Sequence, residues 1–370
     1  MGRRSHHLAL PLTSPFLFIV LILSFSMLPM SLGAQDDFVR GDCLGDGNVE
    51  LGDLVYMMTC VICDPGPAYC YDACDADDDG AYTISDPLYL LNYLFEGDVP
   101  PPPPFPTCGA DPTADSLSCN NYQHDCQTPT PQPPLDSDYI FSIPDGEGAP
   151  GETIAVDVEL EILDGDWLLA CSFGVAHDPN ALALTELLPG TATADVAWAI
   201  FDVRDGGWTG AIIVSVFMQT LWVEGTYPLV TARYQVLGEV GDVTALDFVD
   251  TLGEPPVRTS VVPEWGPEVT PSTVSGTITV STAFRRGDVN LDGIFNIGDP
   301  IWDLLCLFSC FPACLDAHDS NDDGSWDIAD PIYMLGYLFV GGPAPPPPFF
   351  ECGADPTEDV LDCDNFNSCP

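Results

Sequence analysis

The sequence predicts a multidomain protein in which an all-β sandwich is flanked by two small α-helical modules held together by disulfides. Three observations lead to this prediction: an internal repeat at the two ends, cysteines that lie almost entirely within that repeat, and a central segment of short β-type runs. The chain has 370 residues, and at about 100 to 200 residues per domain it has room for several domains.

The chain begins with a segment typical of a secretory signal peptide. Two arginines precede an apolar run over residues 16–28, and small residues follow it. This run is too short to span a bilayer comfortably, so we expect residues 1–34 to be removed by cleavage after Gly33 or Ala34. A retained N-terminal anchor is the alternative. The mature protein is therefore expected to be secreted, either extracellular or at the surface of the cell envelope.

The net charge excludes two classes of partner. The chain has 57 Asp and Glu residues against 8 Lys and Arg, a formal charge of −49 at pH 7. Such a chain would repel nucleic acid and anionic lipid. Hydrophobic residues make up 46% of the sequence, too many for an acidic disordered tail. We therefore expect a folded protein that binds no nucleic acid and does not insert into membranes.

Two copies of one module flank the centre, module 1 over residues 36–127 and module 2 over residues 283–370. The stretch that starts at Asp86 matches the one that starts at Asp330, and FVRGD upstream of the first matches FRRGD upstream of the second. Eight of the 15 cysteines lie in module 1 and six in module 2. In a secreted chain this distribution predicts disulfides within each module.

Each module contains two twelve-residue segments with oxygen ligands at the spacing of a calcium-binding loop. Such a loop supplies oxygens from positions 1, 3, 5, 7, 9 and 12 and has Gly at position 6 for a sharp turn. All four segments have Asp at positions 1, 5 and 12 and Gly at position 6, which a chance cluster of surface acids would not produce. The predicted ligands are Asp42, Asp46, Asn48, Glu50 and Asp53 in loop 1; Asp75, Asp77, Asp79, Ala81, Thr83 and Asp86 in loop 2; Asp288, Asn290, Asp292, Ile294, Asn296 and Asp299 in loop 3; and Asp319, Asn321, Asp323, Ser325, Asp327 and Asp330 in loop 4.

We expect up to four Ca²⁺ ions, with the weakest site in loop 1. Position 3 is Asp77, Asn290 or Asn321 in three of the loops but Leu44 in loop 1. An alkyl group at this position removes a ligand and places an apolar side chain beside the ion.

A helix is expected to leave each loop, and none to enter the first loop of either module. The predicted helices cover residues 53–62, 86–96, 299–309 and 330–340. Prolines in the first turn of three of them are tolerated, because the N–H groups of that turn have no intrahelical partner. A hydrophobic residue fills position 8 of each loop, where paired loops would pack against one another: Val49, Tyr82, Phe295 and Trp326.

Paired calcium loops, each followed by a helix, resemble the dockerin family. The resemblance covers both modules and is specific in the loops, but it departs at loop positions 10 and 11. Dockerins of cellulosomal enzymes usually have a Ser/Thr-type pair there that recognises the partner. The corresponding residues, which we predict to bind a partner, are Leu51 and Gly52, Ile84 and Ser85, Ile297 and Gly298, and Ile328 and Ala329.

Two cysteines of module 1 lack counterparts in module 2. Cys43 and Cys74 correspond to Val289 and His318, so both are missing together. Because paired dockerin loops lie side by side, the resemblance implies a disulfide between Cys43 and Cys74 that compensates for the weak first loop. The connectivity of the other cysteines is left open.

The central segment predicts a β-sandwich over residues 138–282, after a proline-rich linker over residues 128–137. Runs such as TIAVDVEL, LLACSFGVA and YPLVTARYQV alternate with Gly, Pro and Asp, and about nine strands at this spacing are typical of a sandwich. The segments that start at Gly148 and Phe173 resemble the opening strands of a cohesin domain. Carbohydrate-binding modules share this architecture, so the fold does not decide the function.

No catalytic centre is evident in the sequence. It lacks the nucleophile-elbow, zinc-protease, phosphate-loop and dinucleotide motifs. His177 precedes Asp178, but a structural role is expected in a strand-to-turn segment. Cys171 lies in an apolar strand and is expected to be a buried thiol. We therefore expect a protein that is not an enzyme.

The resemblances imply a secreted, calcium-binding adaptor or scaffold for cohesin–dockerin-type assembly, in a setting of extracellular polysaccharide degradation. Its partners would carry cohesin-like or dockerin-like domains, and calcium-dependent self-association and polysaccharide binding are further expectations. One alternative is an accessory of a glycoside hydrolase. Another is a carbohydrate-binding protein, which would need a line of exposed aromatic residues on the sandwich, drawn from Trp167, Trp198, Trp208, Trp222 and Trp265.

Overall fold

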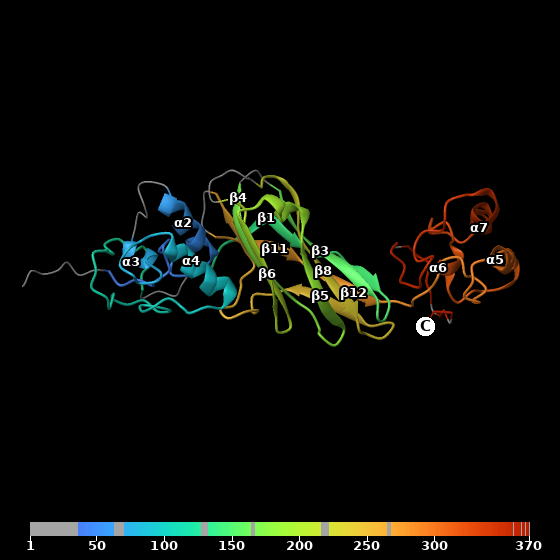
Figure 1. Ribbon diagram of the computed structural model, residues 1–370, viewed down its shortest axis with the longest axis horizontal. Helices are drawn as coiled ribbons and strands as arrows, with labels where there is room; N and C mark the ends of the chain where they lie inside the picture. The colour runs from blue at the N-terminus through green and yellow to red at the C-terminus, as the bar shows by residue number, and fades with distance from the viewer. Residues whose placement is uncertain are drawn as a thin grey trace, which may run out of the picture.

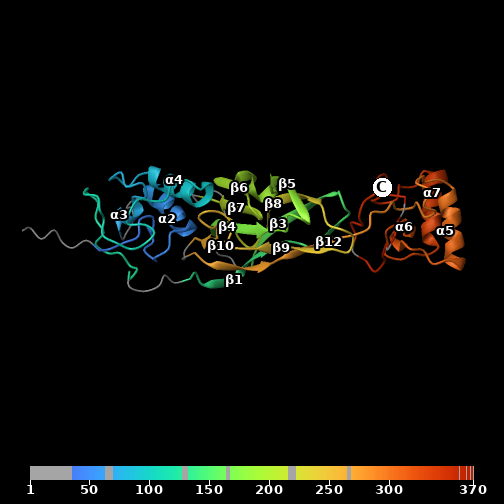
Figure 2. The same ribbon diagram turned by 90° about the horizontal axis from the view of Figure 1, so that it is seen from below.

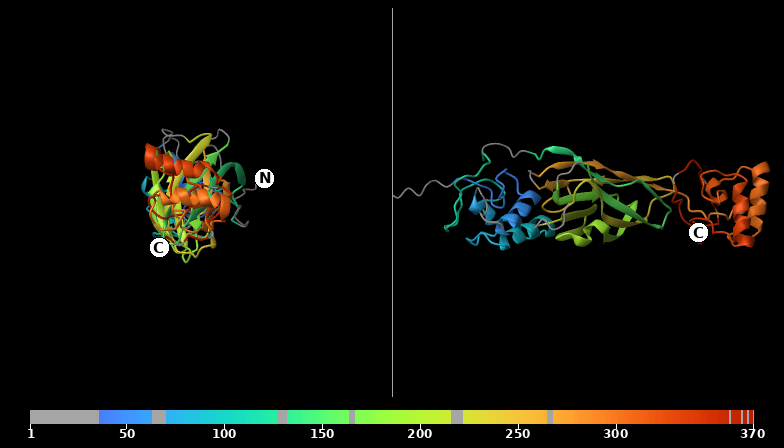
Figure 3. Two further views of the ribbon diagram at one scale, coloured as in Figure 1. Left: turned by 90° about the vertical axis from the view of Figure 1, so that its right-hand side faces the viewer. Right: turned by 90° about the horizontal axis from the view of Figure 1, so that it is seen from above.

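The computed structural model describes residues 36–62, 70–126, 132–163, 167–215, 222–264, 268–357, 359–363, 365–366 and 368–369. The predicted signal peptide lies outside these residues. Module 1, the β-sandwich and module 2 follow one another along an elongated molecule (Figure 1). Figure 2 and the right-hand view of Figure 3 show the same order. Among the described residues, no helix has the length and apolarity needed to cross a membrane.

The centre of the molecule consists of two β-sheets packed face to face. One has the strand order β11-β1-β3-β8-β5, and the other has the order β2-β12-β9-β4-β7-β6 with β10 paired to β4. The twelve described strands exceed the nine expected. Their bounds are β1 (Leu135–Ser142), β2 (Gly146–Gly148), β3 (Thr153–Ile162), β4 (Leu168–Ala176), β5 (Leu182–Pro189), β6 (Trp198–Arg204), β7 (Gly207–Ile213), β8 (Gly225–Val236), β9 (Val243–Phe248), β10 (Ser260–Pro263), β11 (Thr270–Val274) and β12 (Gly276–Val280).

The core between the two sheets follows from the alternation of side chains along each strand. In β3, the buried side chains Val156, Val158 and Leu160 face this core. Trp208 of β7 is fully buried in it and donates an indole N–H hydrogen bond of 2.7 Å to the hydroxyl of Tyr234. The Trp208 ring is therefore buried with its indole N–H paired.

Strand β7 is buried on both faces, and this distinguishes it from β3. Ile212 points into the sandwich core, whereas Ala211 and Ile213 belong to a second apolar cluster with residues of module 1. Module 1 therefore covers the outer face of this sheet.

The helices that leave the loops begin one or two residues before the predicted positions. Their bounds are α2 (Leu51–Ile62), α4 (Ser85–Leu91), α5 (Gly298–Ser309) and α7 (Ala329–Val340), and a π-helical turn, η1 (Asn92–Glu96), extends α4. Two short helices that the sequence did not predict, α3 (Tyr71–Cys74) and α6 (Leu315–His318), precede the second loop of each module. The first strand of the sandwich starts at Leu135, within the predicted linker.

Two disulfides are common to the two modules: Cys70–Cys119 matches Cys314–Cys363, and Cys108–Cys126 matches Cys352–Cys369. Cys43 is bonded to Cys74, the pair that the resemblance implies. Cys171 is a buried thiol, and burial raises its pKa. Module 2 also contains the disulfide Cys306–Cys310.

The hydrophobic residues at position 8 of the loops pack onto helices and tails. Tyr82 donates its hydroxyl hydrogen to the carbonyl oxygen of Met57, over 2.6 Å. Phe295 contacts the rings of Tyr337 and Phe349.

Candidate functional site

Each of the four loops is wrapped around its first aspartate. The carboxylate at position 1 accepts hydrogen bonds from the backbone N–H groups of positions 5 and 6, with distances between 2.7 and 3.2 Å. Position 4 has a positive φ in every loop, a conformation that only Gly adopts without cost. The residues there are Gly45, Asp78, Leu291 and Asp322, with φ between 59° and 72°.

The aspartate at position 12 closes each loop. Its Oδ2 accepts a hydrogen bond of 2.7 to 3.0 Å from the backbone N–H of position 9. The same aspartate lies in the first turn of the exiting helix in all four loops, where its negative charge interacts favourably with the helix dipole. The position-1 and position-12 aspartates are thus fixed by the backbone and completely buried in all four loops.

Several observations fit a calcium ion in these loops. Oxygens of Asp75, Asp77 and Asp86 lie within 4.8 Å of one another in loop 2. In module 2, Asp299 Oδ1 and Asn321 Oδ1 are buried ligand atoms without a hydrogen-bond partner. The donors are carboxylate, amide and carbonyl oxygens, the ligands that Ca²⁺ prefers. The residues that would hold the ions are those predicted from the sequence.

Burial raises the pKa of the aspartates that close the loops. It raises the pKa of Asp86 to about 7 and that of Asp330 to about 7, and neighbouring carboxylates contribute in the same direction. The pKa of Asp299 is raised to about 6, again mainly by burial. A bound cation would offset the repulsion between these carboxylates.

Loop 1 is engaged by groups from outside the loop. The hydroxyl of Tyr122 donates a hydrogen bond to Asp42 Oδ2, and Arg258 of the sandwich contacts Glu50 Oε2 at 3.0 Å. Burial, together with nearby Glu268, raises the pKa of Glu50 to about 8. Sequence reasoning missed Tyr122, Arg258 and Glu268, because their distance along the chain gives no local signal.

A buried arginine connects the parts of each module. Arg286 contacts Asp322 Oδ1 at 2.9 Å and Asp355 Oδ1 at 2.7 Å, and it donates to the carbonyl oxygens of Asp316 and Asp319. Its counterpart in module 1 is Arg40, which makes the same contacts. Sequence reasoning did not identify this role, although the match of FVRGD with FRRGD contains both arginines.

The predicted partner-binding residues have different surroundings in the two modules. Leu51 is buried, and the N–H of Gly52 donates a hydrogen bond of 2.7 Å to Glu268 of the sandwich. Ile297 and Ile328 of module 2 are exposed. Of the remaining predicted residues, Ile84 is exposed, and Ser85, Gly298 and Ala329 are partly exposed. The N–H of Ala329 donates a hydrogen bond to Asp327 Oδ1 at the start of α7.

Module 1 is docked onto the outer face of β4, β6, β7 and β10. Val55 of α2 and Phe95 of η1 share an apolar cluster with Ile213 and Val262 of the sandwich. The rings of Phe95 and Trp198 are 6.0 Å apart. Arg204 donates a hydrogen bond of 2.7 Å to the carbonyl oxygen of Phe95. We call this set of contacts the docked face.

The equivalent face of module 2 is exposed. Three pairs of matched positions show the contrast in exposed side-chain surface. The exposed fraction is 3% for Leu51 and 43% for Ile297, 4% for Val55 and 60% for Ile301, and 5% for Phe95 and 67% for Phe339. We call the exposed residues Ile297, Ile301, Leu305 and Phe339 the free face.

The tryptophans do not form an exposed line on the described part of the sandwich. Trp208 and Trp222 are buried and Trp198 lies beside Phe95, which leaves Trp167 exposed. Trp265 lies outside the described residues. The aromatic surface that the carbohydrate-binding alternative needs is therefore absent from the described sandwich.

The two residues considered for catalysis have structural surroundings. His177 packs edge-on against the ring of Tyr234, and burial lowers its pKa. Cys171 lies in the sandwich core.

Comparisons with known proteins give partial matches to solved structures. No family model matches the chain, and no curated protein matches it. Among solved structures, a non-cellulosomal cohesin from the hyperthermophilic archaeon Archaeoglobus fulgidus is 18% identical, with a TM-score of 0.32, over 40% of this chain and 93% of that one. The seventh ScaB type I cohesin from Pseudobacteroides cellulosolvens is 16% identical, with a TM-score of 0.34, over 39% and 92%.

A third cohesin, from ScaC of Acetivibrio cellulolyticus, was solved in complex with the ScaB dockerin. It is 14% identical, with a TM-score of 0.33, over 38% of this chain and 98% of that one. Each of these matches covers about two fifths of this chain.

Proposed function

We propose that this chain is a secreted, calcium-dependent assembly protein whose module 2 docks onto a cohesin-like β-sandwich of another protein. The observation that supports this most is the contrast between two copies of one module. Module 1 buries its docked face against a sandwich, and module 2 exposes the matching residues. The structure thus contains an example of the contact that we propose for module 2.

The free face has the composition of a protein contact. Ile301, Leu305 and Phe339 are exposed together on helices α5 and α7, which pack against each other. Large exposed apolar patches are uncommon on monomeric proteins and mark interaction sites. In most interfaces a few well-packed side chains near the centre contribute most of the binding energy.

The partner sandwich would come from a different protein. Module 1 already occupies the outer face of β4 and β7 in this chain, so the face is not open to module 2 of another copy. The expected self-association is therefore blocked as long as module 1 remains docked. This arrangement would prevent the chain from polymerising through a heterologous contact.

Calcium would set the shape of both faces. Loop positions 10 and 11 begin or immediately precede each helix of the face, and the position-12 aspartate that would bind the ion lies in the first turn. Without the ion, buried carboxylates repel one another, so metal binding and ordering of the face are coupled.

The test uses the full mature chain and its own sandwich as the probe. Val55→Asp places a charge in the docked face and should release module 1 from the sandwich. In calcium, the open face should then bind module 2 of a second copy, and light scattering should show association that increases with concentration. The wild-type chain should stay monomeric.

The matched control is the double variant Val55→Asp with Ile301→Asp, which also damages the free face. It should be monomeric in calcium, because association requires both faces. A chelator should dissociate the single variant. Aggregation that persists in the double variant would show nonspecific stickiness, and a monomeric single variant whose module 1 is released would overturn the proposal.

Carbohydrate binding is a second candidate that no observation favours, since Trp167 is the one exposed aromatic residue of the described sandwich.

A further inference from the structure

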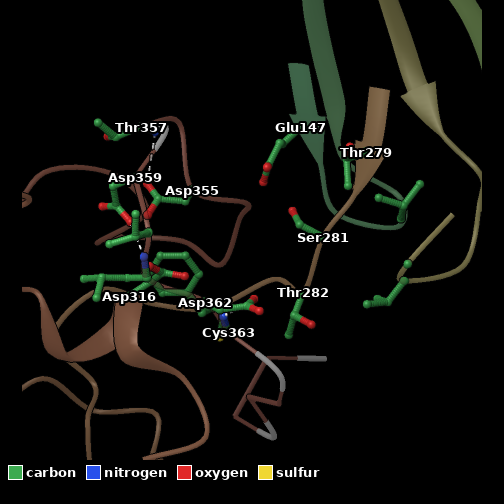
Figure 4. A pocket seen from close by; sticks show the side chains of 16 residues that line it. Glu147, Thr279, Ser281, Thr282, Asp316, Asp355, Thr357, Asp359, Asp362 and Cys363 are labelled. Atoms are coloured by element: carbon green, nitrogen blue, oxygen red, sulfur yellow. Dashed lines mark hydrogen bonds between the residues drawn. The ribbon is translucent and has the colours of Figure 1, made fainter. Parts of the chain in front are cut away.

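Each module has a third group of acids outside the two loops. In module 2 it consists of Asp316, at the start of α6, and of Asp355 and Asp359 in the tail, the segment after the last helix (residues 341–369). One carboxylate oxygen from each of these three residues lies within 4.8 Å of the others. Figure 4 shows Asp355 and Asp359 side by side above Asp316.

The strongest sign of a ligand is an unsatisfied atom in this group. Asp316 is only 6% exposed, and its Oδ1 is buried without a hydrogen-bond partner. Leaving a buried carboxylate oxygen unpaired is costly, so such an atom in a folded protein indicates an ion or a water.

The other two carboxylates are held in place and keep an oxygen for a ligand. Asp355 Oδ1 accepts from Arg286 and from the N–H of Thr357, and Asp359 Oδ1 accepts from the N–H of Leu361. All these bonds use Oδ1, which leaves Oδ2 of each residue.

The negative charge of the group exceeds its positive charge. The three acids and neighbouring Asp322 bring four carboxylates, against the one guanidinium of Arg286. Burial raises the pKa of Asp316 to about 7, with Asp355 and Asp359 adding to the effect. A divalent cation would balance most of the remaining charge.

Module 1 repeats the three-acid group and the contacts of its two tail acids. Asp72, Asp111 and Asp115 form its group, again with oxygens within 4.8 Å. Asp111 Oδ1 accepts from Arg40 and from the N–H of Thr113. Asp115 Oδ1 accepts from the N–H of the residue two positions later, as Asp359 does.

We propose that Asp316, Asp355 and Asp359 bind a third calcium ion of module 2, beside loop 4. The group in module 1 binds a corresponding ion beside loop 2. Three carboxylates supply part of the oxygen shell, and water completes it, because the site opens into a cleft of about 680 Å³ between module 2 and the end of the sandwich. The ion ties the disulfide-bonded tail to the helical turn before the second loop.

The test counts calcium bound to the full mature chain with its disulfides formed, by equilibrium dialysis and atomic emission. Asp115→Asn with Asp359→Asn removes one exposed carboxylate from each group, and the amide oxygen keeps the hydrogen bond to the backbone. This variant should bind two calcium ions fewer than the wild type. Asp178→Asn, which alters an exposed aspartate with a similar backbone bond in the sandwich, should bind as many as the wild type.

A second pair of variants separates these sites from the loops, because Asp359 also lies near Asp319 and Asp322. Asp86→Asn with Asp330→Asn weakens loops 2 and 4. Adding the two tail substitutions should remove two further ions. If the combined variant binds as many ions as the loop variant, the tail acids belong to the loop sites and the proposal is wrong. The count does not depend on whether module 2 docks onto a partner, so the two proposals fail separately.

Discussion

At the scale of single residues, one buried arginine joins separate segments of each module. Arg286 is completely buried and joins the FRRGD segment, loop 4, the proline run and the tail through one guanidinium. The planar fork of arginine makes several directed hydrogen bonds at once, which lysine cannot do. The guanidinium of Arg286 also lies over the ring of Phe284, which adds a cation–π interaction.

We predict that Arg286→Gln destabilises module 2 by about 3 to 5 kcal/mol, because removal of one partner leaves buried carboxylates uncompensated. The neighbouring Arg285 is the control, since it is only partly buried and donates to one carbonyl oxygen, that of Gly293. Arg285→Gln should cost about 1 kcal/mol or less. Denaturant unfolding of the calcium-loaded chain measures both, and equal losses would contradict the role of Arg286.

Module 2 lacks the disulfide that joins Cys43 and Cys74 in module 1, and a buried polar cluster lies near this position. His318 replaces Cys74, and its Nδ1 lies 2.6 Å from Asp303 Oδ1. Trp326 donates an indole N–H to the same oxygen over 2.8 Å. In module 1 the residue that matches Asp303 is Met57, which is fully buried.

We predict that His318→Leu destabilises module 2 by about 3 kcal/mol or more, because the buried Asp303 carboxylate loses one of its two hydrogen-bond partners in the core. Adding Asp303→Met, the residue that module 1 has at this position, should recover most of the loss. Thermal unfolding of the single and double variants tests this. A double variant less stable than the single one would rule the interpretation out.

At the scale of elements, the loops and the helices that leave them form one unit. The helices begin one or two residues before the predicted start, because the bond of the position-12 carboxylate to position 9 already organises the first turn. Helix and loop are therefore expected to form together when calcium binds.

The raised pKa values of the loop aspartates predict that the stability of the protein depends on pH. The pKa values of Asp42, Asp86, Asp299 and Asp330 are raised by burial to about 6 or 7, above their ordinary value of 3.8. Without calcium, the folded state therefore binds more protons than the unfolded state between about pH 4 and pH 7, and its stability falls as pH rises through that window. Calcium binds the deprotonated loops, so the stabilisation it provides should grow over the same range.

The measurement is the calcium-induced shift of the unfolding temperature, in calcium-depleted and calcium-loaded samples. It should be larger at pH 7.5 than at pH 5. A shift of equal size at both pH values would contradict the coupling between loop carboxylates and the ion.

Loop 1 differs from the other loops in its third position. We predict that Leu44→Asn raises the calcium affinity of this loop by about tenfold, which corresponds to about 1.4 kcal/mol, because it restores the missing oxygen ligand. Titration calorimetry of the full chain should find one weak site in the wild type that strengthens in the variant. Substitution of Leu291, at position 4 of loop 3, is the control, since that position provides no ligand. If the site stays weak in the variant, Leu44 is not the cause of its low calcium affinity. The contact of Glu50 with Arg258 would then be an alternative cause.

At the scale of the whole molecule, the two copies of the module differ in their surroundings. Module 1 packs against one side of the sandwich and completes its burial, whereas module 2 lies at the far end with its free face exposed (Figure 1). Module 1 thus adds a layer of helices over the outer face of the sheet that contains β4 and β7.

We predict that chelation of calcium loosens module 1 from the sandwich. Trp198 is then exposed, because it loses the ring of Phe95. Its fluorescence emission should shift to longer wavelength, and the Trp198→Phe variant should lack this component. The same spectrum with and without calcium would show that docking does not depend on the loops.

Local spacing allowed much of this protein to be predicted from its sequence. The twelve-residue pattern placed the four loops, because ligand positions within a loop are set by short-range backbone geometry. The helices expected to leave the loops correspond closely to α2, α5 and α7, and the repeat marked Cys43 and Cys74 as a pair. The β-type runs predicted a sandwich, and two packed sheets are found.

What the tertiary structure alone decided involves residues far apart in the chain. Asp316 and Asp359 belong to one group only because the tail folds back onto α6, and Glu50 meets Arg258 only because module 1 docks on the sandwich. The difference between Leu51, which is buried, and Ile297, which is exposed, has the same origin. Leu51 and Ile297 occupy the same position of the repeated module, so the sequence determined that each is an apolar residue able to form a contact. The packing of the domains decided that the contact of Leu51 is formed within this chain and that Ile297 stays exposed.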